Sequence, residues 1–322
     1  MAKNPANTAP AIRLPYLDDF LLNLQTNNFS MQTIYNYERD LNVFENFLAE
    51  NKIDFKEADK KTILNYKAYL TSLDRHTPKK MPGEKKLSSF SINRMLSALR
   101  SYLKFSIDMD FHPPISPQMV GLLKTERKKI RISEFEHIIQ LLEAPNVFEK
   151  NKKVIRRNRA MLEMLFATGM RISELTNLKT EQIDKKGRIF IMGKGKKERF
   201  VYLTPRAQKH LDSYLENRPI TESPYLFIPY SGRNMSKKYK KISANYLQQK
   251  IKDYREFLGI NLPLSAHGFR RAFATYLAEK GASPAAIQIL LGHESLDTTT
   301  RYVNASNKFA EQTHRKFHPL KE

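Results

Sequence analysis

The chain has 322 residues, of which 41% are hydrophobic and 27% charged, so it has enough apolar side chains for the cores of two ordinary domains. It contains no cysteine, which excludes disulfide bonds and thiolate metal sites and fits a reducing compartment. No apolar run approaches the roughly 18 residues that a membrane span needs, and the N-terminal residues lack the apolar core of a signal peptide. We therefore expect a cytoplasmic protein with no membrane contact.

The formal net charge of +22 is distributed unevenly. Residues 1–125 hold 17 Lys and Arg against 13 Asp and Glu, whereas residues 126–322 hold 38 against 20, which gives net charges of +4 and +18. Such an excess stores electrostatic repulsion that a polyanion relieves as its counterions are released. Nucleic acid is the favoured partner, ahead of a membrane surface, while composition alone also allows a basic protein with no such partner.

The first 125 residues predict an all-helical domain. Apolar side chains recur every three or four positions in residues 30–51, 60–73 and 88–109, and Ser30 and Ser88 or Ser89 are suitable N-caps. Residues 74–86 form a Pro-, Gly- and Lys-rich loop, and residues 111–131 contain three prolines and a basic run. We expect a tail at 1–13, a helical domain at 14–112 and a linker at 113–132.

The second domain, expected at 133–322, is mostly helical with a small sheet. Its helices are predicted near 133–143, across 157–178, after Pro205, and at 244–259, 265–281, 283–293 and 295–304. Residues 187–203 alternate apolar and polar side chains around Gly-Lys-Gly-Lys-Lys, which is typical of a β-hairpin with a basic turn. The sequence therefore predicts a mainly α fold with an all-α domain followed by a mixed α+β domain.

Cationic residues in this second domain are candidates for binding phosphate. His267 and Arg270 stand three residues apart and project from one face of the predicted helix. Arg171 follows a glycine that interrupts an apolar helix, and Glu174 at i+3 can orient its guanidinium for a planar fork on two phosphate oxygens. Taken singly, a His-x-x-Arg pair and an Arg–Glu pair are also common on solvated surfaces.

Three further residues complete the candidate site. Lys194 lies between glycines in the predicted turn, where its ammonium can bind phosphate or donate a proton, although turn lysines are usually only solvated. The Tyr302 hydroxyl is a poor nucleophile while neutral, but nearby cations favour its phenolate and His293 or His267 can accept its proton. Neither His267 nor His293 has a paired His or Cys at metal-ligand spacing. The set suits attack on a phosphodiester without a metal.

The sequence resembles the tyrosine recombinases, especially their Xer and integrase-like members, over roughly residues 14–320. RNRAMLEMLFATGMRISEL resembles the first arginine box of that family, and IFIMGKGKKERFVYL its catalytic-lysine hairpin. HGFRRAFATYL resembles the His-x-x-Arg box, and LLGHESLDTTTRYV the segment that holds the last histidine and the nucleophilic tyrosine. The N-terminal helices are similar to the SAM-like core-binding domain of the family.

This resemblance implies a role for each candidate. Arg171 and Arg270 would clamp the scissile phosphate, and Lys194 would be the general acid for the leaving 5′ oxygen. His267 would be a base or hydrogen-bond partner, and His293 a donor in the transition state. Tyr302 would be the nucleophile of a 3′-phosphotyrosyl intermediate, with Glu174 supporting Arg171. Neither metal, nor ATP, nor another cofactor is then required.

The resemblance also implies a homotetramer on two double-stranded DNA sites of palindromic or attachment type, with a partner recombinase as a possible addition. Xer proteins typically have His-x-Leu-Arg-His in the third box, whereas this chain has Arg271 at the last position, as phage and element integrases do. Chromosome dimer resolution and element integration or excision therefore both stay open. A type IB topoisomerase-like relaxing enzyme and a catalytically inactive DNA-binding relative are the alternative functions.

The tail after Tyr302 carries Phe309 and Phe317 among polar residues, and such tails dock in trans within the cyclic tetramers of the resembling family. We predict that truncation after residue 306 preserves binding of one half-site but reduces cooperative assembly on the full site. Gel-shift titrations on half and full sites, paired with strand-specific cleavage, measure this. Unchanged cooperativity would refute docking in trans and leave a frayed terminus.

Overall fold

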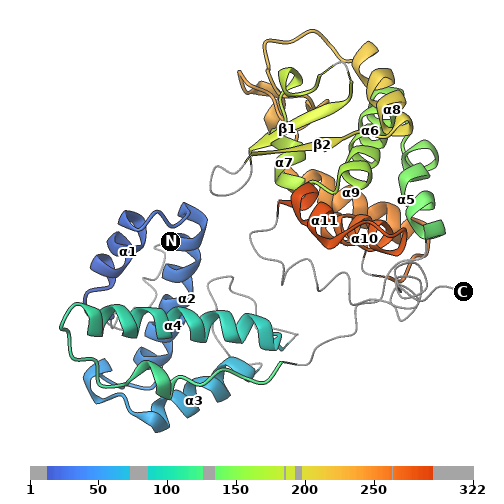
Figure 1. Ribbon diagram of the computed structural model, residues 1–322. Coiled ribbons are helices and arrows are strands. Elements are labelled where there is room, and N and C mark those ends of the chain that lie inside the picture. The colour runs from blue at the N-terminus through green and yellow to red at the C-terminus, as the bar shows by residue number, and fades with distance from the viewer. Residues whose placement is uncertain are drawn as a thin grey trace, which may run out of the picture. The chain divides into compact units, whose positions relative to one another are not determined.

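The computed structural model describes residues 13–72, 86–125, 135–184, 186–192, 198–262 and 264–292. The chain divides into two compact units, residues 1–129 and 130–322, each with its own apolar core. In the described residues, no helix is both long enough and apolar enough to span a membrane. The predicted mainly α fold with a small sheet is confirmed (Figure 1).

Helices form the N-terminal unit: α1 (Leu17–Thr26), α2 (Met31–Glu50), α3 (Lys60–Thr71) and α4 (Ser89–Asp108). The Ser30 and Ser88 side chains accept hydrogen bonds from the backbone of Thr33 and Ser91, so both predicted N-caps are present. The sequence analysis did not identify α1, whose Leu17, Phe20 and Leu24 pack into the core.

Part of the segment predicted as a linker is packed against this unit. Ile115 and Val120 are buried in its core, and a short 3-10 helix, Pro117–Met119, lies against α4. The Asn93 side chain donates to the Leu123 carbonyl and accepts from the Leu123 backbone N–H, at 2.9 and 2.8 Å. These contacts place the chain through Leu123 in the N-terminal unit.

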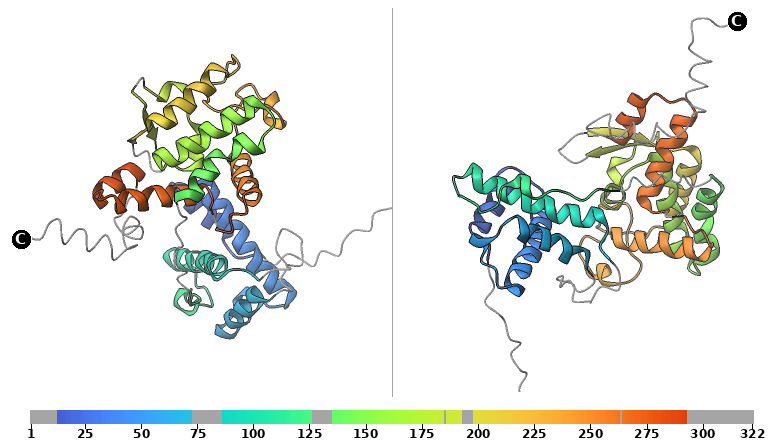
Figure 2. Two further views of the ribbon diagram at one scale, coloured as in Figure 1. Left: turned by 90° about the vertical axis from the view of Figure 1, so that its right-hand side faces the viewer. Right: turned by 90° about the horizontal axis from the view of Figure 1, so that it is seen from below.

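The C-terminal unit is built around α6, which contacts α5, α8 and α10 and has most of its side chains buried. Its elements are α5 (Phe135–Phe148), α6 (Lys152–Thr168), α7 (Ile172–Asn177), β1 (Arg188–Met192), β2 (Glu198–Tyr202), α8 (Pro205–Glu216), α9 (Ala244–Phe257), α10 (Ala266–Glu279) and α11 (Pro284–Leu291). Both views in Figure 2 show α11, in red, beside α10, in agreement with their contacts.

The helix predicted across 157–178 consists of two helices, and the break falls at the glycine that the sequence indicated as an interruption. Gly169 ends α6 in the left-handed conformation, with φ of 61°, and α7 starts at Ile172. A Cβ at Gly169 would lie 2.4 Å from a ring carbon of Phe273, so the tight packing of α10 against this turn requires glycine. The break turns the chain so that Arg171 begins a new helix at the edge of the core.

The predicted strands are confirmed as an antiparallel pair in which Arg188 lies opposite Tyr202 and Met192 opposite Glu198. Ile189, Ile191 and Val201 are buried, while the intervening side chains are more exposed. The basic turn at 193–197 and all residues from 293 onward lie outside the described residues. The predicted helix at 295–304 and the tail after Tyr302 therefore also lie outside the described residues.

Candidate active site

The turn between α6 and α7 positions Arg171. The Arg171 backbone N–H donates to Glu174 Oε2 at 2.7 Å, which caps the start of α7, and the Arg171 guanidinium donates to Glu174 Oε1 at 2.9 Å. One carboxylate thus fixes both the main chain and the side chain of the same arginine. The Arg171 side chain is 40% exposed, so part of its guanidinium still faces outward.

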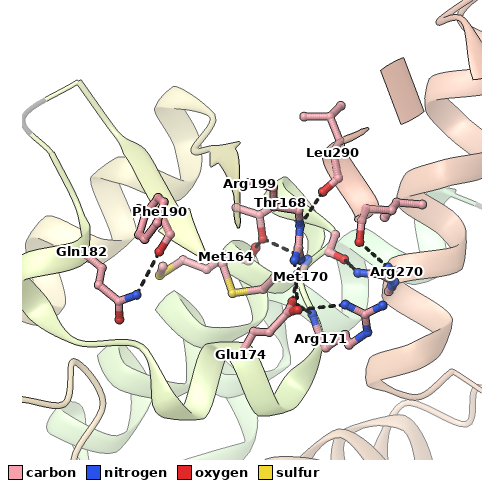
Figure 3. Close-up of polar contacts among 12 residues, drawn as sticks. Met164, Thr168, Met170, Arg171, Glu174, Gln182, Phe190, Arg199, Arg270 and Leu290 are labelled. Carbon is pink, nitrogen blue, oxygen red and sulfur yellow. Dashed lines mark hydrogen bonds and ion pairs between the residues drawn. The ribbon is translucent and has the colours of Figure 1, made fainter. Parts of the chain in front are cut away.

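A second arginine shares the same carboxylate. Arg199 of β2 donates to Glu174 Oε1 and Oε2 at 3.0 and 2.7 Å, which forms a two-pronged ion pair. The side chains of Glu174 and Arg199 are only 8% and 5% exposed. Figure 3 shows the Glu174 carboxylate between the two guanidiniums. Because a single negative charge meets two positive ones, the cluster keeps a net positive charge beside the exposed face of Arg171.

The pKa of Glu174 is lowered. Burial of the carboxyl acts to raise the pKa, but the hydrogen bonds from Arg199 and from the backbone and side chain of Arg171 outweigh burial. The carboxylate therefore stays ionised throughout the neutral range, and the ion pairs that hold Arg171 persist there.

Arg270 of α10 is anchored to two helix ends. It is 4% exposed, and its guanidinium donates to the carbonyl of Gly169 at 2.8 Å and to that of Leu291 at 2.6 Å. These carbonyls end α6 and α11, where the helix dipoles concentrate negative charge. Arg270 is thus bonded to Gly169, which lies two residues before Arg171 in the turn between α6 and α7. We refer to Arg171, Glu174, Arg199 and Arg270 as the arginine site.

His267 lies one turn before Arg270 on α10, and its side chain is exposed. Partial desolvation and the positive charges of Arg271, Arg270 and Arg171 lower its pKa below the ordinary histidine value. The imidazole is therefore neutral at pH 7 and has one nitrogen available to accept a hydrogen bond or a proton.

The other three predicted site residues, Lys194, His293 and Tyr302, lie outside the described residues. In the sequence Lys194 follows β1 by two residues, and His293 follows Gly292, the left-handed C-cap of α11. A hollow beside Arg171 is lined by residues of α7 and of the end of β1, including Ser173, Asn177 and Met192.

Arg199 is the site residue that the sequence analysis missed. A usable signal exists, because in the alternating strand ERFVY it falls on the same face as the buried Val201. An arginine on the buried face of a strand requires an anionic partner, and the partner here comes from α7. Among the described residues, His, Cys, Asp and Glu nowhere form a group of three that can hold a metal ion.

Chemically, the arginine site is a rigid cationic site with an outward guanidinium beside a neutral imidazole. Its donors are fixed before any ligand arrives, which is the condition for stabilising negative charge on phosphoryl oxygens with little reorganisation. A planar guanidinium can donate two parallel hydrogen bonds to such oxygens.

Both units of the chain match models of known protein families. The model of the phage integrase family matches residues 130–308, and that of the phage integrase N-terminal SAM-like domain matches residues 17–109. The chain is 32% identical over 298 residues to the tyrosine recombinase XerC of Leptospira interrogans. The aligned region covers 91% of this chain and 89% of that relative.

Two solved structures share the fold. A crystal structure of the XerH site-specific recombinase bound to palindromic difH substrate, in a post-cleavage complex, has a TM-score of 0.69 at 21% identity and covers 95% of this chain and 90% of that one. The crystal structure of a lambda integrase tetramer bound to a Holliday junction has a TM-score of 0.66 at 16% identity. It covers 95% of this chain and 79% of that one.

Glu174→Gln tests the arginine site. The amide keeps the size of the side chain but replaces one acceptor oxygen with a donor that faces guanidinium donors. We predict DNA affinity within a few-fold of wild type and strand cleavage slower by roughly 10- to 100-fold, as expected for the loss of hydrogen bonds to a charged group. Single-turnover cleavage and gel shifts on a nicked duplex, selected from random-sequence DNA by the wild-type chain, measure both.

The matched control is Glu163→Gln. Glu163 is also a buried carboxylate shared by two arginines, Arg159 and Arg206, and no hydrogen bond connects it with the arginine site. Equal losses of cleavage in the two variants would attribute the effect to the stability of the domain instead.

Proposed function

The chain belongs to the phage integrase family of tyrosine recombinases, and from that premise we propose that it cuts and rejoins DNA at specific sites through a 3′-phosphotyrosyl intermediate. The observation that carries the proposal is the Glu174 carboxylate, which Arg199 pairs with and which holds the partly exposed side chain of Arg171. Arg270 is bonded to the carbonyl of Gly169, two residues before Arg171 in the sequence. Two fixed guanidiniums suit a phosphodiester whose non-bridging oxygens gain negative charge during attack.

In the proposed first step, the Tyr302 oxygen attacks the scissile phosphorus. A bond forms between phosphorus and the Tyr302 oxygen, and the bond to the 5′ oxygen breaks. Lys194 donates a proton to that leaving oxygen, and His267, neutral at pH 7, accepts a hydrogen bond or the proton of Tyr302. Arg171, Arg270 and His293 donate to the phosphoryl oxygens.

In the second step, the 5′ hydroxyl of another strand attacks the phosphotyrosine, and the Tyr302 oxygen leaves. One phosphodiester bond replaces another, so the energy of the bond is kept and the exchange needs no ATP. The residues proposed for these two steps also provide the acid, the base and the charge stabilisation, so the scheme assigns no role to a metal ion.

The partner we propose is double-stranded DNA at a palindromic or attachment-type site, bound by a homotetramer on two sites in the cytoplasm. The net charge of +22 supports a polyanionic partner. The names of the fold neighbours are in line with this, since one is bound to palindromic difH substrate and another is a tetramer on a Holliday junction. Dimer resolution and element integration or excision are two uses of the same chemistry.

Tyr302→Phe tests the nucleophile. The change removes one hydroxyl, so DNA binding is predicted to stay nearly intact while covalent complex formation is abolished. The selected duplex with a nick near the cleavage point traps the covalent link, which a denaturing gel then detects. A trapped band that persists in the variant would reject Tyr302, and Tyr276 would be examined next. Relaxed supercoils without recombinant products from the wild-type chain would instead indicate a topoisomerase-like enzyme.

Lys194→Ala tests the acid. Cleavage of ordinary DNA is predicted to slow by roughly 10²- to 10⁴-fold, the usual contribution of a general acid. A 5′-bridging phosphorothiolate is predicted to restore most of the rate, because its sulfur leaves without protonation. Equal defects on the two substrates would assign the proton to another group, with Lys196 and Lys197 as the next candidates.

A further inference from the structure

Arg199 has an unusual position for a cation. It lies on the buried face of β2, and its guanidinium donates to the Glu174 carboxylate and, through Nε at 3.0 Å, to the Leu290 carbonyl of α11. Its guanidinium therefore joins three elements, α7, β2 and α11, that are far apart in the sequence (Figure 3).

We propose that Arg199 is a positioning residue, which holds Glu174 in the rotamer that fixes the guanidinium of Arg171 and secures the end of α11 beside it. The proposal deepens the proposed function, on which its catalytic consequence rests. In this account Arg199 acts through Glu174 and α11 and not by contact with DNA, since its Nε and both Nη atoms already donate to Glu174 and Leu290.

The first argument concerns Arg171. An ion pair of a partly exposed arginine with a single freely rotating carboxylate contributes little order, because water competes and both side chains lose entropy. The Glu174 carboxylate is not freely rotating, since the two parallel bonds from Arg199 fix its plane. Arg171 therefore meets an acceptor that is already in place. Without Arg199, the same carboxylate would be buried with one partner fewer.

The second argument concerns the end of α11. The carbonyls of Leu290 and Leu291 are adjacent, and they accept from Arg199 and Arg270 respectively. Gly292 follows in the left-handed conformation, and a Cβ on it would lie 3.0 Å from the Cδ of Arg199. Arg199 thus packs against Gly292 and bonds to the carbonyl of Leu290, so the same guanidinium holds both the partner of Arg171 and the end of α11.

The test compares Arg199→Gln and Arg199→Lys with wild type in the full-length chain. The first readout is the ¹⁵N spectrum of the Arg171 guanidinium in the DNA-free protein, assigned by Arg171→Lys. We expect separate, slowly exchanging Nη signals in wild type. We expect averaged signals in Arg199→Gln, because the carboxylate that restrains Arg171 is then no longer held in one plane.

The second readout is single-turnover cleavage of the selected nicked duplex as a function of pH. Cleavage by Arg199→Gln should be roughly 10- to 100-fold slower near pH 7, with Arg199→Lys between it and wild type, since Lys restores a charge but not the planar fork. Loss of Arg199 removes a hydrogen bond that lowers the pKa of Glu174, so Glu174 gains its proton at a higher pH than in wild type. The wild-type to variant rate ratio should therefore grow as the pH falls.

Arg159→Gln is the matched control. Arg159 is as buried as Arg199 and is also paired with a buried carboxylate, that of Glu163, without a hydrogen bond to the arginine site. Both glutamine variants should unfold at a lower temperature than wild type. Only Arg199→Gln should average the Arg171 signals and change the rate ratio with pH.

Unchanged Arg171 signals in Arg199→Gln, or a rate ratio that is independent of pH and equal to that of Arg159→Gln, would overturn the proposal and leave Arg199 a purely structural ion pair. A wild-type chain that forms no covalent complex would instead reject the proposed function. The spectrum of the DNA-free protein would still decide whether Arg199 positions Arg171, so the two failures are distinguishable.

Discussion

The carboxylate of Glu174 pairs with two guanidinium groups from different elements, and the organisation of the arginine site depends on that shared pairing. A buried arginine on β2 is tolerated only with an anionic partner, and a buried glutamate on α7 only with a cationic one. Each therefore requires the other, and their ion pair links β2 to α7. Arg171, the more exposed of the two arginines, is then held by an acceptor whose position is already set.

Backbone geometry also contributes to the arrangement of the arginine site. The left-handed Gly169 allows α10 to pack closely against the turn, which places the Gly169 carbonyl within reach of Arg270. Arg270 and Arg199 then hold the adjacent carbonyls that end α11. The apolar core beneath α6 makes this arrangement rigid, since close-packed interiors resist small displacements. Cationic side chains from three segments, the start of α7, β2 and α10, thus converge.

The sequence was sufficient for the parts of the fold that depend on periodicity. The long amphipathic helices and the alternating strand pair follow from apolar spacing alone, and Arg171, Glu174, His267 and Arg270 follow from local motifs. The sequence indicates that Gly169 interrupts the helix, but apolar spacing does not show the packing that requires glycine at this position. That position is fixed by the ring of Phe273, a contact over about a hundred residues of sequence. The strand pattern places Arg199 on the buried face, but it does not show that the partner is Glu174 of α7.

The central claim is that Glu174 is an ionised, doubly paired carboxylate in the free protein. The direct measurement is a ¹³C NMR titration of side-chain-labelled glutamate in the DNA-free chain, with the Glu174 signal assigned from its loss in Glu174→Gln. The account predicts that Glu174 titrates below the ordinary glutamate pKa of about 4.3. A Glu174 pKa at or above that value would show that burial outweighs the two arginines, and would contradict a preset arginine site.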